Sequence, residues 1–250
     1  MLGRLFSDLI RSAAKGRLSL GDASPRDANP LEDYFRNNTG RQIVKWQHYF
    51  EIYHRHFATF RGRSPVVVEI GVLKGGSLQM WHHYFGPGTR VVGVDIDPGC
   101  LEFEDGDTTI LIGDQADREF LATFRERVPR VDILIDDGGH TMTQQITTFE
   151  ELYPHVQPEG VYLCEDMQTS LWSEFGGGYG KPGTFLDYSK SLIDRLYGWH
   201  SRDPAALAVD AFTRSAHSLH FYDGVLVIEK RPMERPRQYM TGETPDRGGA

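Results

Sequence analysis

Short apolar runs alternate with segments of helical periodicity through most of the chain. Five runs are rich in β-branched residues and apolar at consecutive positions, the pattern of strands that are buried on both faces. The predicted strands are Val66–Ile70, Val91–Asp95, Thr109–Ile112, Val131–Ile135 and Val161–Cys164, followed by Leu219–Tyr222 and Val225–Ile228. The spacing of apolar residues predicts helices at Ile43–Phe57, Ser77–Phe85, Arg118–Val128, Thr143–Tyr153 and Phe185–Leu196.

The order of these elements predicts an α/β fold with a doubly wound, mostly parallel sheet. A strand followed by a helix, repeated four times, is typical of such a domain. The last two predicted strands are separated only by Asp223-Gly224, a two-residue turn of the type that hairpins favour. A parallel sheet that ends in an antiparallel hairpin resembles the seven-stranded, Rossmann-like class I methyltransferase fold more than a dinucleotide-binding fold.

Both ends of the chain differ in composition from this α/β part. Residues 1–28 combine a weak amphipathic pattern with a polar stretch, which predicts either a flexible arm or a short interface helix. Residues 232–250 are rich in Pro, Arg and Gly and lack apolar periodicity, which predicts a disordered tail. We therefore expect one folded domain at residues 29–231.

The composition excludes few classes of protein. With 27 Lys and Arg against 35 Asp and Glu in 250 residues, the net charge of −8 argues against sequence-independent binding to nucleic acid, which needs a basic surface. Cys100 and Cys164 are too few for a disulfide framework and fit a reducing cytoplasm. The sequence has no run of about 18 apolar residues and no secretory signal at its start, so we expect a cytoplasmic protein without a membrane span.

The loop after the first predicted strand has features of a cofactor site. Glu69 precedes Gly71, and Gly75 and Ser77 follow, so the spacing is E-x-G-x-x-x-G rather than the G-x-G-x-x-G of dinucleotide sites. Glycines allow a tight turn and a close approach of the backbone to a ligand. A carboxylate before the first glycine suits a cationic ligand without phosphate, and S-adenosylmethionine (SAM) is such a ligand. A purely structural tight turn explains the same loop.

Two further strand ends support SAM as the cofactor. Asp95 closes the second strand 24 residues after Gly71, where a carboxylate can accept hydrogen bonds from both ribose hydroxyls. Asp97 is the alternative, but we expect it to cap the turn that follows. Asp114 comes after the third strand, where the adenine end of the cofactor is expected, and a plain loop explains this residue almost as well.

Four carboxylates and an imidazole follow two neighbouring strands. Asp136, Asp137 and His140 come after the fourth strand, and Glu165 and Asp166 come after the fifth. Carboxylates that crowd at one edge repel each other unless a cation is bound, and oxygen ligands favour Mg²⁺, Mn²⁺ or Ca²⁺ over zinc. We predict Asp137, Glu165 and Asp166 as metal ligands and expect Asp136 to face the methionine part of SAM. In the alternative, these carboxylates cap helices, and His140 caps the helix that follows it.

Three segments of the chain carry a resemblance to a known family. They are KWQHYFEIY at Lys45–Tyr53, IDDGGH at Ile135–His140 and CEDMQTSLWSEFGGG at Cys164–Gly178. They resemble the metal-dependent sugar O-methyltransferases of macrolide biosynthesis, of the mycinamicin VI 2''-O-methyltransferase type. The similarity extends over about residues 45–230. In that family, the D-D-G-x-H and E-D motifs carry a magnesium site and a catalytic histidine.

The resemblance implies roles for individual residues. Asp137, Glu165 and Asp166 would hold the metal, and His140 would be the catalytic base. Gly139 stands where the family often has serine, which is a small departure. The chain is also expected to lack the extra N-terminal domain of the larger members, so the oligomeric state and the substrate stay open. A homo-oligomer with the N-terminal arm as a contact is one alternative.

Other features allow two interpretations. The glycine-rich segment Gly176–Gly183 is either a lid over the acceptor or a surface loop. Aromatic residues recur at helical spacing in the predicted Ile43–Phe57 helix, which favours a core position, and the resemblance implies that the start of this helix also walls the site. No ligand role is predicted for the histidines without a partner motif, namely His54, His56, His82 and His83.

Together these observations predict a SAM- and divalent-metal-dependent O-methyltransferase that acts on a sugar hydroxyl of a glycosylated natural product or glycolipid. A metal that binds two adjacent hydroxyls would lower the pKa of one of them, and His140 could then take its proton. Two alternatives stay open. One is a catechol-type O-methyltransferase, because adjacent phenol oxygens would chelate the same metal. The other is a non-catalytic SAM-binding partner in a biosynthetic complex.

Overall fold

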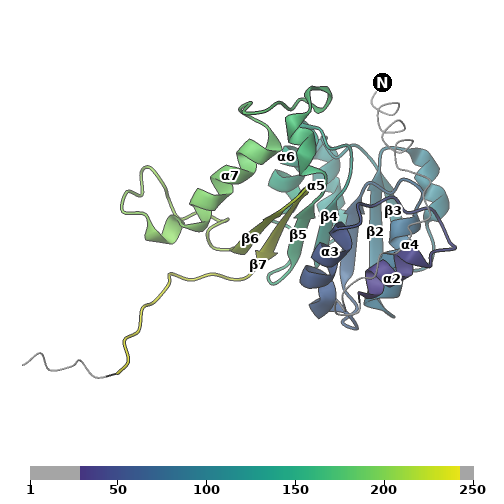
Figure 1. The fold of residues 1–250 in the computed structure, drawn as a ribbon, viewed down its shortest axis with the longest axis horizontal. Coiled ribbons are helices and arrows are strands. Elements are labelled where there is room, and N and C mark those ends of the chain that lie inside the picture. The colour runs from purple at the N-terminus through teal and green to yellow at the C-terminus, as the bar shows by residue number, and fades with distance from the viewer. Residues whose placement is uncertain (1–28, 243–250) are drawn as a thin grey trace, which may run out of the picture.

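A seven-stranded sheet runs through the middle of the computed structural model, which describes residues 29–242 (Figure 1). The strands lie in the order β3-β2-β1-β4-β5-β7-β6. The parallel strands are β1 (Val66–Ile70), β2 (Arg90–Asp95), β3 (Thr108–Ile112), β4 (Ile133–Asp136) and β5 (Val161–Cys164). Antiparallel pairing joins β5 to β7 (Val225–Lys230) and β7 to β6 (Ala216–Tyr222). The predicted α/β fold with its C-terminal hairpin is therefore confirmed.

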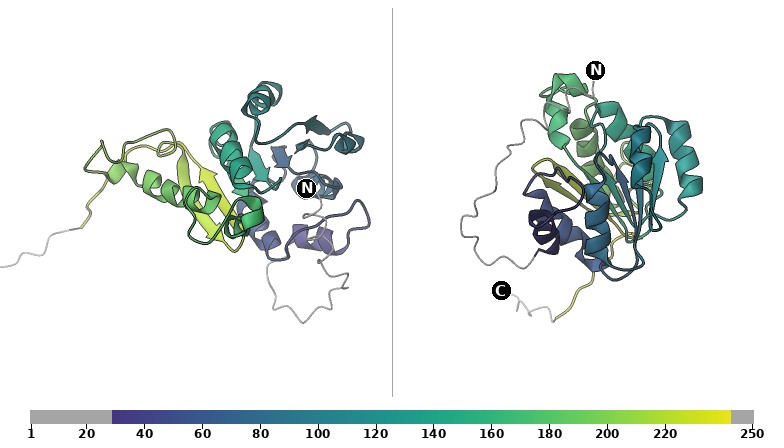
Figure 2. Two further views of the ribbon diagram at one scale, coloured as in Figure 1. Left: turned by 90° about the horizontal axis from the view of Figure 1, so that it is seen from above. Right: turned by 90° about the vertical axis from the view of Figure 1, so that its right-hand side faces the viewer.

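Helices cover both faces of this sheet (Figure 2). One face carries α2 (Pro30–Arg36), α3 (Tyr49–Phe57) and α4 (Gly76–Phe85), and the other carries α5 (Arg118–Arg127), α6 (Met142–Leu152) and α7 (Phe185–Leu196). Successive side chains of β1 alternate between the two cores: Val66 and Val68 pack with α5 and α6, whereas Val67 packs with α3 and α4. Burial on both faces explains why the parallel strands are apolar at consecutive positions.

The predicted helix Ile43–Phe57 is wrong in its first half. Helix α3 begins only at Tyr49, and residues 43–46 form neither helix nor strand. The extended segment reaches across the carboxyl ends of the strands. There Lys45 and Trp46 bond to carboxylates of the loops that follow β4 and β5. These tertiary bonds outweigh the helical periodicity, which is a weak local preference.

Gly71 allows the loops after β1 and β4 to lie against each other. Its φ is +94°, and a Cβ at this position would lie 1.9 Å from the carbonyl oxygen of Asp137. An L-residue with a side chain would therefore be strained and would also push the two loops apart. The close approach fixes the position of the loop that carries Asp137 and His140.

The two ends of the chain limit what can be compared with the sequence predictions. The predicted arm at residues 1–28 and residues 243–250 of the predicted tail lie outside the described part of the chain. Residues 231–240 form no helix or strand, and Figure 1 shows this stretch leading away from the sheet. Across residues 29–242, no helix combines the length and the apolar character needed to cross a bilayer.

Candidate active site

A cavity of about 1150 Å³ lies at the carboxyl ends of the parallel strands. Its walls come from the segment before α3, the loops after β1 to β5 and the turn between β6 and β7. Ligands of open α/β sheets bind at this edge. Its volume lies slightly above the roughly 300–1,000 Å³ that is usual for the site of one small ligand.

Three of the residues predicted to bind the cofactor line the cavity, namely Gly71, Asp95 and Asp114. One carboxylate oxygen of Asp95 accepts hydrogen bonds from the backbone N–H groups of Val72 and Leu73 at 2.8 and 3.2 Å. Asp95 therefore shapes the loop after β1 while it faces the cavity. Asp97 accepts a bond from the N–H of Gly99 at 2.9 Å, so the expectation that it caps the next turn is confirmed.

Three other residues predicted to bind the cofactor do not line the cavity, namely Glu69, Gly75 and Ser77. The Ser77 hydroxyl donates to Glu69 Oε2 at 2.5 Å, and Glu69 is fully buried. Gly75 has a φ of +69° and lies against the ring of Phe103. These residues support the turn that leads into α4 rather than the cavity surface.

Asp136 also lies away from the cavity, contrary to the expectation that it faces the methionine part of SAM. It is the last residue of β4, and its side chain is buried on the α6 side of the sheet. Gln115 Nε2 donates to its Oδ1 at 2.9 Å, and the Tyr162 hydroxyl lies 3.4 Å from its Oδ2. Burial raises the pKa of Asp136 to about 7. Because successive strand residues face opposite sides, only Asp137 of the D-D pair can turn toward the cavity.

Gln115 is a supporting residue that the sequence reasoning did not single out. Its Oε1 accepts the backbone N–H of Gly139 at 2.7 Å, while its Nε2 bonds to Asp136 and to Thr148 Oγ1. The amide thus joins the loops after β3 and β4. Its position next to Asp114 was the available signal in the sequence.

Asp137 and Asp166 line the cavity, and His140 lies close to both of them. His140 Nε2 lies 3.8 Å from Asp137 Oδ1 and 3.5 Å from Asp166 Oδ2. One potential ligand atom from each of the three residues lies within 4.8 Å of the others. The structure therefore brings together the histidine and two of the three predicted metal ligands.

Asp166 is oriented by three donors on one of its oxygens. Trp46 Nε1, the Tyr49 hydroxyl and Gln168 Nε2 lie 3.1, 2.9 and 2.9 Å from Oδ1. Its other oxygen, Oδ2, faces His140. The backbone of Asp166 has a φ of +54°, in the left-handed region that few non-glycine residues adopt. Trp46 and Tyr49 also line the cavity, so the implied role of this segment as a wall of the site is confirmed.

Lys45 is a buried cation in the middle of the carboxylates, and the sequence reasoning gave it no role. Its ammonium bonds to Asp137 and Glu165, the latter at 2.9 Å, and lies 3.4 Å from Glu69. Burial alone would lower the pKa of Lys45, but the three carboxylates raise it well above its usual value. The side chain therefore stays charged. The sequence signal was its place at the start of the first segment that carries the family resemblance.

Glu165 lies beside the cluster of Asp137, His140 and Asp166 but is not part of it. The Tyr53 hydroxyl donates to its Oε1 at 2.7 Å, and Lys45 bonds to the same oxygen. Burial raises the pKa of Glu165 to about 8 and that of Asp137 to about 7, although Lys45 acts in the opposite direction on both. Carboxyl groups held this close in a site of low dielectric favour the binding of a further cation.

His140 is buried beside these carboxylates. Its side chain is 1 % exposed, and its backbone adopts a φ of +56°. Burial lowers the pKa of His140, so the imidazole is neutral near pH 7 and can accept a proton. The alternative in which His140 caps the next helix is wrong, because the cap of α6 is Thr141, which forms a capping box with Gln144. His140 itself does not line the cavity, and an acceptor must approach it past Asp137 and Asp166.

The glycine-rich segment contributes through the residues just before it. Trp172 and Phe175 line the cavity, whereas residues 176–183 do not. Tyr179 in that loop is 96 % exposed. A lid role for residues 176–183 stays a prediction.

Comparisons with known proteins agree with this arrangement. Residues 68–167 match the protein family described as "Methyltransferase domain". The 8-demethyl-8-alpha-L-rhamnosyl tetracenomycin-C 2'-O-methyltransferase of Streptomyces olivaceus is 37% identical over 191 residues, which are 73% of this chain and 50% of that protein. Mycinamicin VI 2''-O-methyltransferase of Micromonospora griseorubida is 38% identical over 188 residues, 71% of this chain and 47% of that protein.

A solved structure shows the same likeness in three dimensions. It is that of MycE, a methyltransferase from the mycinamycin biosynthetic pathway, in complex with Mg, SAH and mycinamycin VI. The TM-score is 0.70 at 34% sequence identity, and the match covers 82% of this chain and 53% of MycE. The chain thus spans about half the length of the relatives that it matches.

Proposed function

We propose that this chain is a SAM- and divalent-metal-dependent O-methyltransferase of the sugar O-methyltransferase family of macrolide and polyketide biosynthesis, on the basis of its similarity to members of that family. Its acceptor is a sugar hydroxyl of a glycosylated natural product or glycolipid. The observation that carries this proposal is that Asp137, His140 and Asp166 lie close together beside a cavity of about 1150 Å³ at the carboxyl ends of the parallel strands.

The donor set fits a hard divalent cation. Asp137 and Asp166 offer carboxylate oxygens to the same point, and Glu165 lies beside them, bonded to Lys45. Oxygen-rich sets of this kind favour Mg²⁺, with Mn²⁺ and Ca²⁺ as related candidates. When bound, the cation would make a coordinated hydroxyl more acidic. Asp137, Glu165 and Asp166 are its proposed ligands.

The cofactor would bind along the part of the cavity that Gly71, Asp95 and Asp114 line. Gly71 would let the backbone come close to SAM, Asp95 would accept hydrogen bonds from the ribose hydroxyls, and Asp114 would lie at the adenine end. Glu69, Gly75 and Ser77 act indirectly, because they hold the turn between β1 and α4. Asp136 acts indirectly as well, since its bond to Gln115 fixes the loop that precedes His140.

His140 is the proposed catalytic base. Its neutral imidazole takes the proton of the acceptor hydroxyl as the oxygen attacks the methyl group of SAM. The O–H bond and the S–CH₃ bond break, the O–CH₃ bond forms, and the products are the methyl ether, S-adenosylhomocysteine and the imidazolium of His140. Asp166, held by Trp46 and Tyr49, stabilises this imidazolium. The remaining task of the protein is to align oxygen, carbon and sulfur.

A methyl-transfer assay with labelled SAM tests this function. The purified chain is incubated with a panel of glycosylated polyketides, glycolipids and catechols, with Mg²⁺ or with EDTA. Transfer to a sugar hydroxyl that EDTA abolishes and Mg²⁺ restores supports the proposal. Transfer to catechols alone identifies a catechol-type enzyme, and SAM binding without transfer to any acceptor identifies a non-catalytic partner. Transfer that persists in EDTA contradicts the proposed metal.

A further inference from the structure

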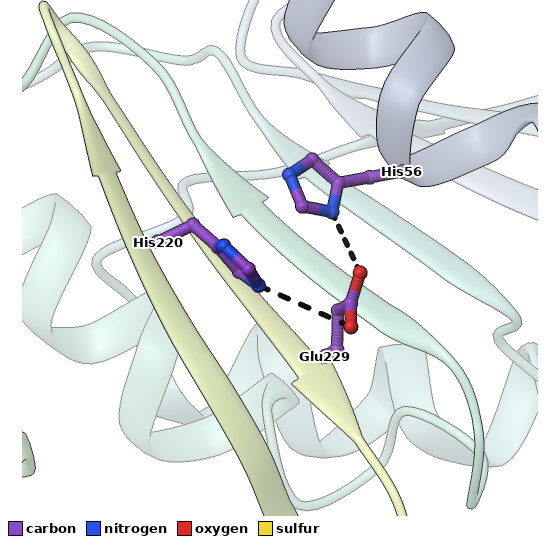
Figure 3. A group of neighbouring side chains, drawn as sticks. All are labelled: His56, His220 and Glu229. Atoms are coloured by element: carbon purple, nitrogen blue, oxygen red, sulfur yellow. Dashed lines mark hydrogen bonds and ion pairs between the residues drawn. The ribbon is translucent and has the colours of Figure 1, made fainter.

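A second group of possible metal ligands lies on the α3 side of the hairpin at the sheet edge. It consists of His56 near the end of α3, His220 in β6 and Glu229 in β7, which point toward one another from three elements (Figure 3). His56 Nδ1 lies 2.7 Å from Glu229 Oε1, and His220 Nε2 lies 4.0 Å from Glu229 Oε2. One ligand atom from each residue lies within 4.8 Å of the other two.

We propose that His56, His220 and Glu229 form a binding site for a divalent transition-metal ion of the Zn²⁺ class. Two imidazole nitrogens and one carboxylate oxygen favour Zn²⁺, Co²⁺ or Ni²⁺ over Mg²⁺. The site therefore differs in chemistry from the oxygen-rich cluster of the cavity. It also uses His56, which the sequence predicted to be a core-edge residue without a ligand role.

The neighbouring side chains have the arrangement expected around metal ligands. His56 Nε2 lies 2.9 Å from the Tyr222 hydroxyl, which leaves Nδ1 to face Glu229. A metal-binding histidine normally uses its second nitrogen in such a bond, which fixes the ring and its tautomer. The Ser218 hydroxyl lies 2.9 Å from His220 Nε2 and 3.2 Å from Glu229 Oε2, so an ion that binds Nε2 would displace this hydroxyl from the nitrogen.

His56 and Glu229 are in the protonation states that metal binding requires. The His56 side chain is 2 % exposed, and burial lowers its pKa, so the ring is neutral near pH 7. Burial opposes the ionisation of Glu229, but its bond with His56 outweighs this and leaves the pKa of Glu229 lowered. A bound ion would take the place of the proton between Nδ1 and Oε1, and the neutral ring would then carry its proton on Nε2, where it can donate to the Tyr222 hydroxyl. Ligands of a tetrahedral Zn²⁺ ion lie about 3.3 Å apart, so these two atoms need to separate only slightly from 2.7 Å.

An ion at this site would fasten α3 to the β6–β7 hairpin. The same helix carries Tyr49 and Tyr53, which donate to Asp166 and Glu165 in the cavity. The turn of the hairpin also reaches the cavity, where the carbonyl oxygen of Gly224 accepts the N–H of Met167 at 2.9 Å. An ion bound to these three residues would therefore hold together two elements that position Asp166 and Glu165, the proposed ligands of the cation in the cavity. It would not contact the reacting atoms.

Titration with Co²⁺ in excess Mg²⁺ tests this site, because nitrogen-ligated Co²⁺ has characteristic visible absorption bands. We expect one equivalent of such Co²⁺ in the wild-type chain and an affinity at least about 10-fold lower in His220→Ala and Glu229→Gln. His54→Ala, a change on the same helix outside the ligand group, should bind Co²⁺ like the wild type. Zn²⁺ should raise the melting temperature of the wild type and of His54→Ala, but not that of His220→Ala.

The Asp166→Asn variant separates this site from the cavity. Its nitrogen-ligated Co²⁺ signal should stay intact, whatever the variant does to methyl transfer. His220 is partly exposed, so His220→Gln serves as a second variant if His220→Ala fails to fold. Equal Co²⁺ binding in the wild type and both His220 variants, loss of the signal in Asp166→Asn, or a wild type without nitrogen-ligated Co²⁺ would each overturn the proposal.

Discussion

At the scale of single residues, the site depends on which groups bond to each of the two oxygens of a carboxylate. Asp166 gives Oδ1 to three donors and turns Oδ2 toward His140. The E-D motif in the sequence located Asp166 but not these donors, because Trp46 and Tyr49 lie far away along the chain. The D-D pair was expected to place Asp137 at the metal and Asp136 at SAM, but Asp136, as the last residue of β4, is buried away from the cavity. Motifs located the proposed ligands, whereas their partners required the fold.

Tyr49→Phe tests the orientation of Asp166. The change removes one hydroxyl that donates to Oδ1 and keeps the buried ring. Loss of a bond that orients a ligand typically weakens metal binding by about 10–100-fold, so we expect the Mg²⁺ concentration for half-maximal activity to rise by that factor. Tyr84→Phe, which removes the buried hydroxyl bonded to His54, is the control. An unchanged Mg²⁺ requirement in Tyr49→Phe would show that Asp166 is held without Tyr49.

Lys45→Met tests the role of the buried cation. It leaves Glu69, Asp137 and Glu165 without their compensating charge in a site from which water is largely excluded. Removing one partner of a buried ion pair lowers the free energy of unfolding by about 3–5 kcal/mol, so the metal-free variant should unfold at a clearly lower temperature. Mg²⁺ should restore more stability to Lys45→Met than it adds to the wild type. Thermal unfolding with and without Mg²⁺ measures both effects, and the exposed Lys190→Met is the control.

Should Mg²⁺ stabilise the wild type and Lys45→Met equally, the ion does not share carboxylates with Lys45. A metal-free Lys45→Met with the melting temperature of the wild type would show that the three carboxyl groups need no cation for folding.

At the scale of elements, the sequence predicted strands better than the helix that walls the site. Apolar β-branched runs located the five parallel strands, because both of their faces are buried, and the Asp223-Gly224 turn marked the two strands of the hairpin. The periodicity of Trp46, Tyr49, Phe50 and Tyr53 predicted one long helix, but Trp46 leaves the pattern to bond to Asp166. The tertiary bonds that unwind this segment involve residues more than ninety positions away, which no local pattern reveals.

Gly71→Ala tests the contact between the loops after β1 and β4. A methyl group at a φ of +94° would be strained and would overlap the carbonyl oxygen of Asp137. We expect a loss of at least about 2 kcal/mol in the free energy of unfolding, together with weaker SAM binding. Gly106→Ala, where a Cβ meets no atom within 4 Å, is the matched control. Chemical denaturation and calorimetry measure the two effects, and wild-type values for Gly71→Ala would mean that the loops tolerate a wider separation.

At the scale of the whole molecule, sheet topology explains why residues far apart in sequence form one site. The order of the strands brings the ends of β1, β4 and β5 together, and the alternation of strands and helices in the sequence predicted the parallel sheet in which these ends share one edge. Five of the 35 Asp and Glu residues lie at these ends, and Lys45 bonds to three of them, Glu69, Asp137 and Glu165. The His56–His220–Glu229 group was not predictable, because α3 meets the C-terminal hairpin only in the folded chain.

The substitution of His140 by alanine tests the central claim most directly. Turnover of the His140→Ala variant is measured with SAM, Mg²⁺ and an accepted glycosylated substrate, and SAM affinity is measured by calorimetry on the same preparation. General-base catalysis contributes about 10²–10⁴-fold, so kcat should fall by that factor while the Kd for SAM stays within about threefold of the wild type. A His140→Ala variant that turns over at the wild-type rate would contradict the assignment of His140 as the base.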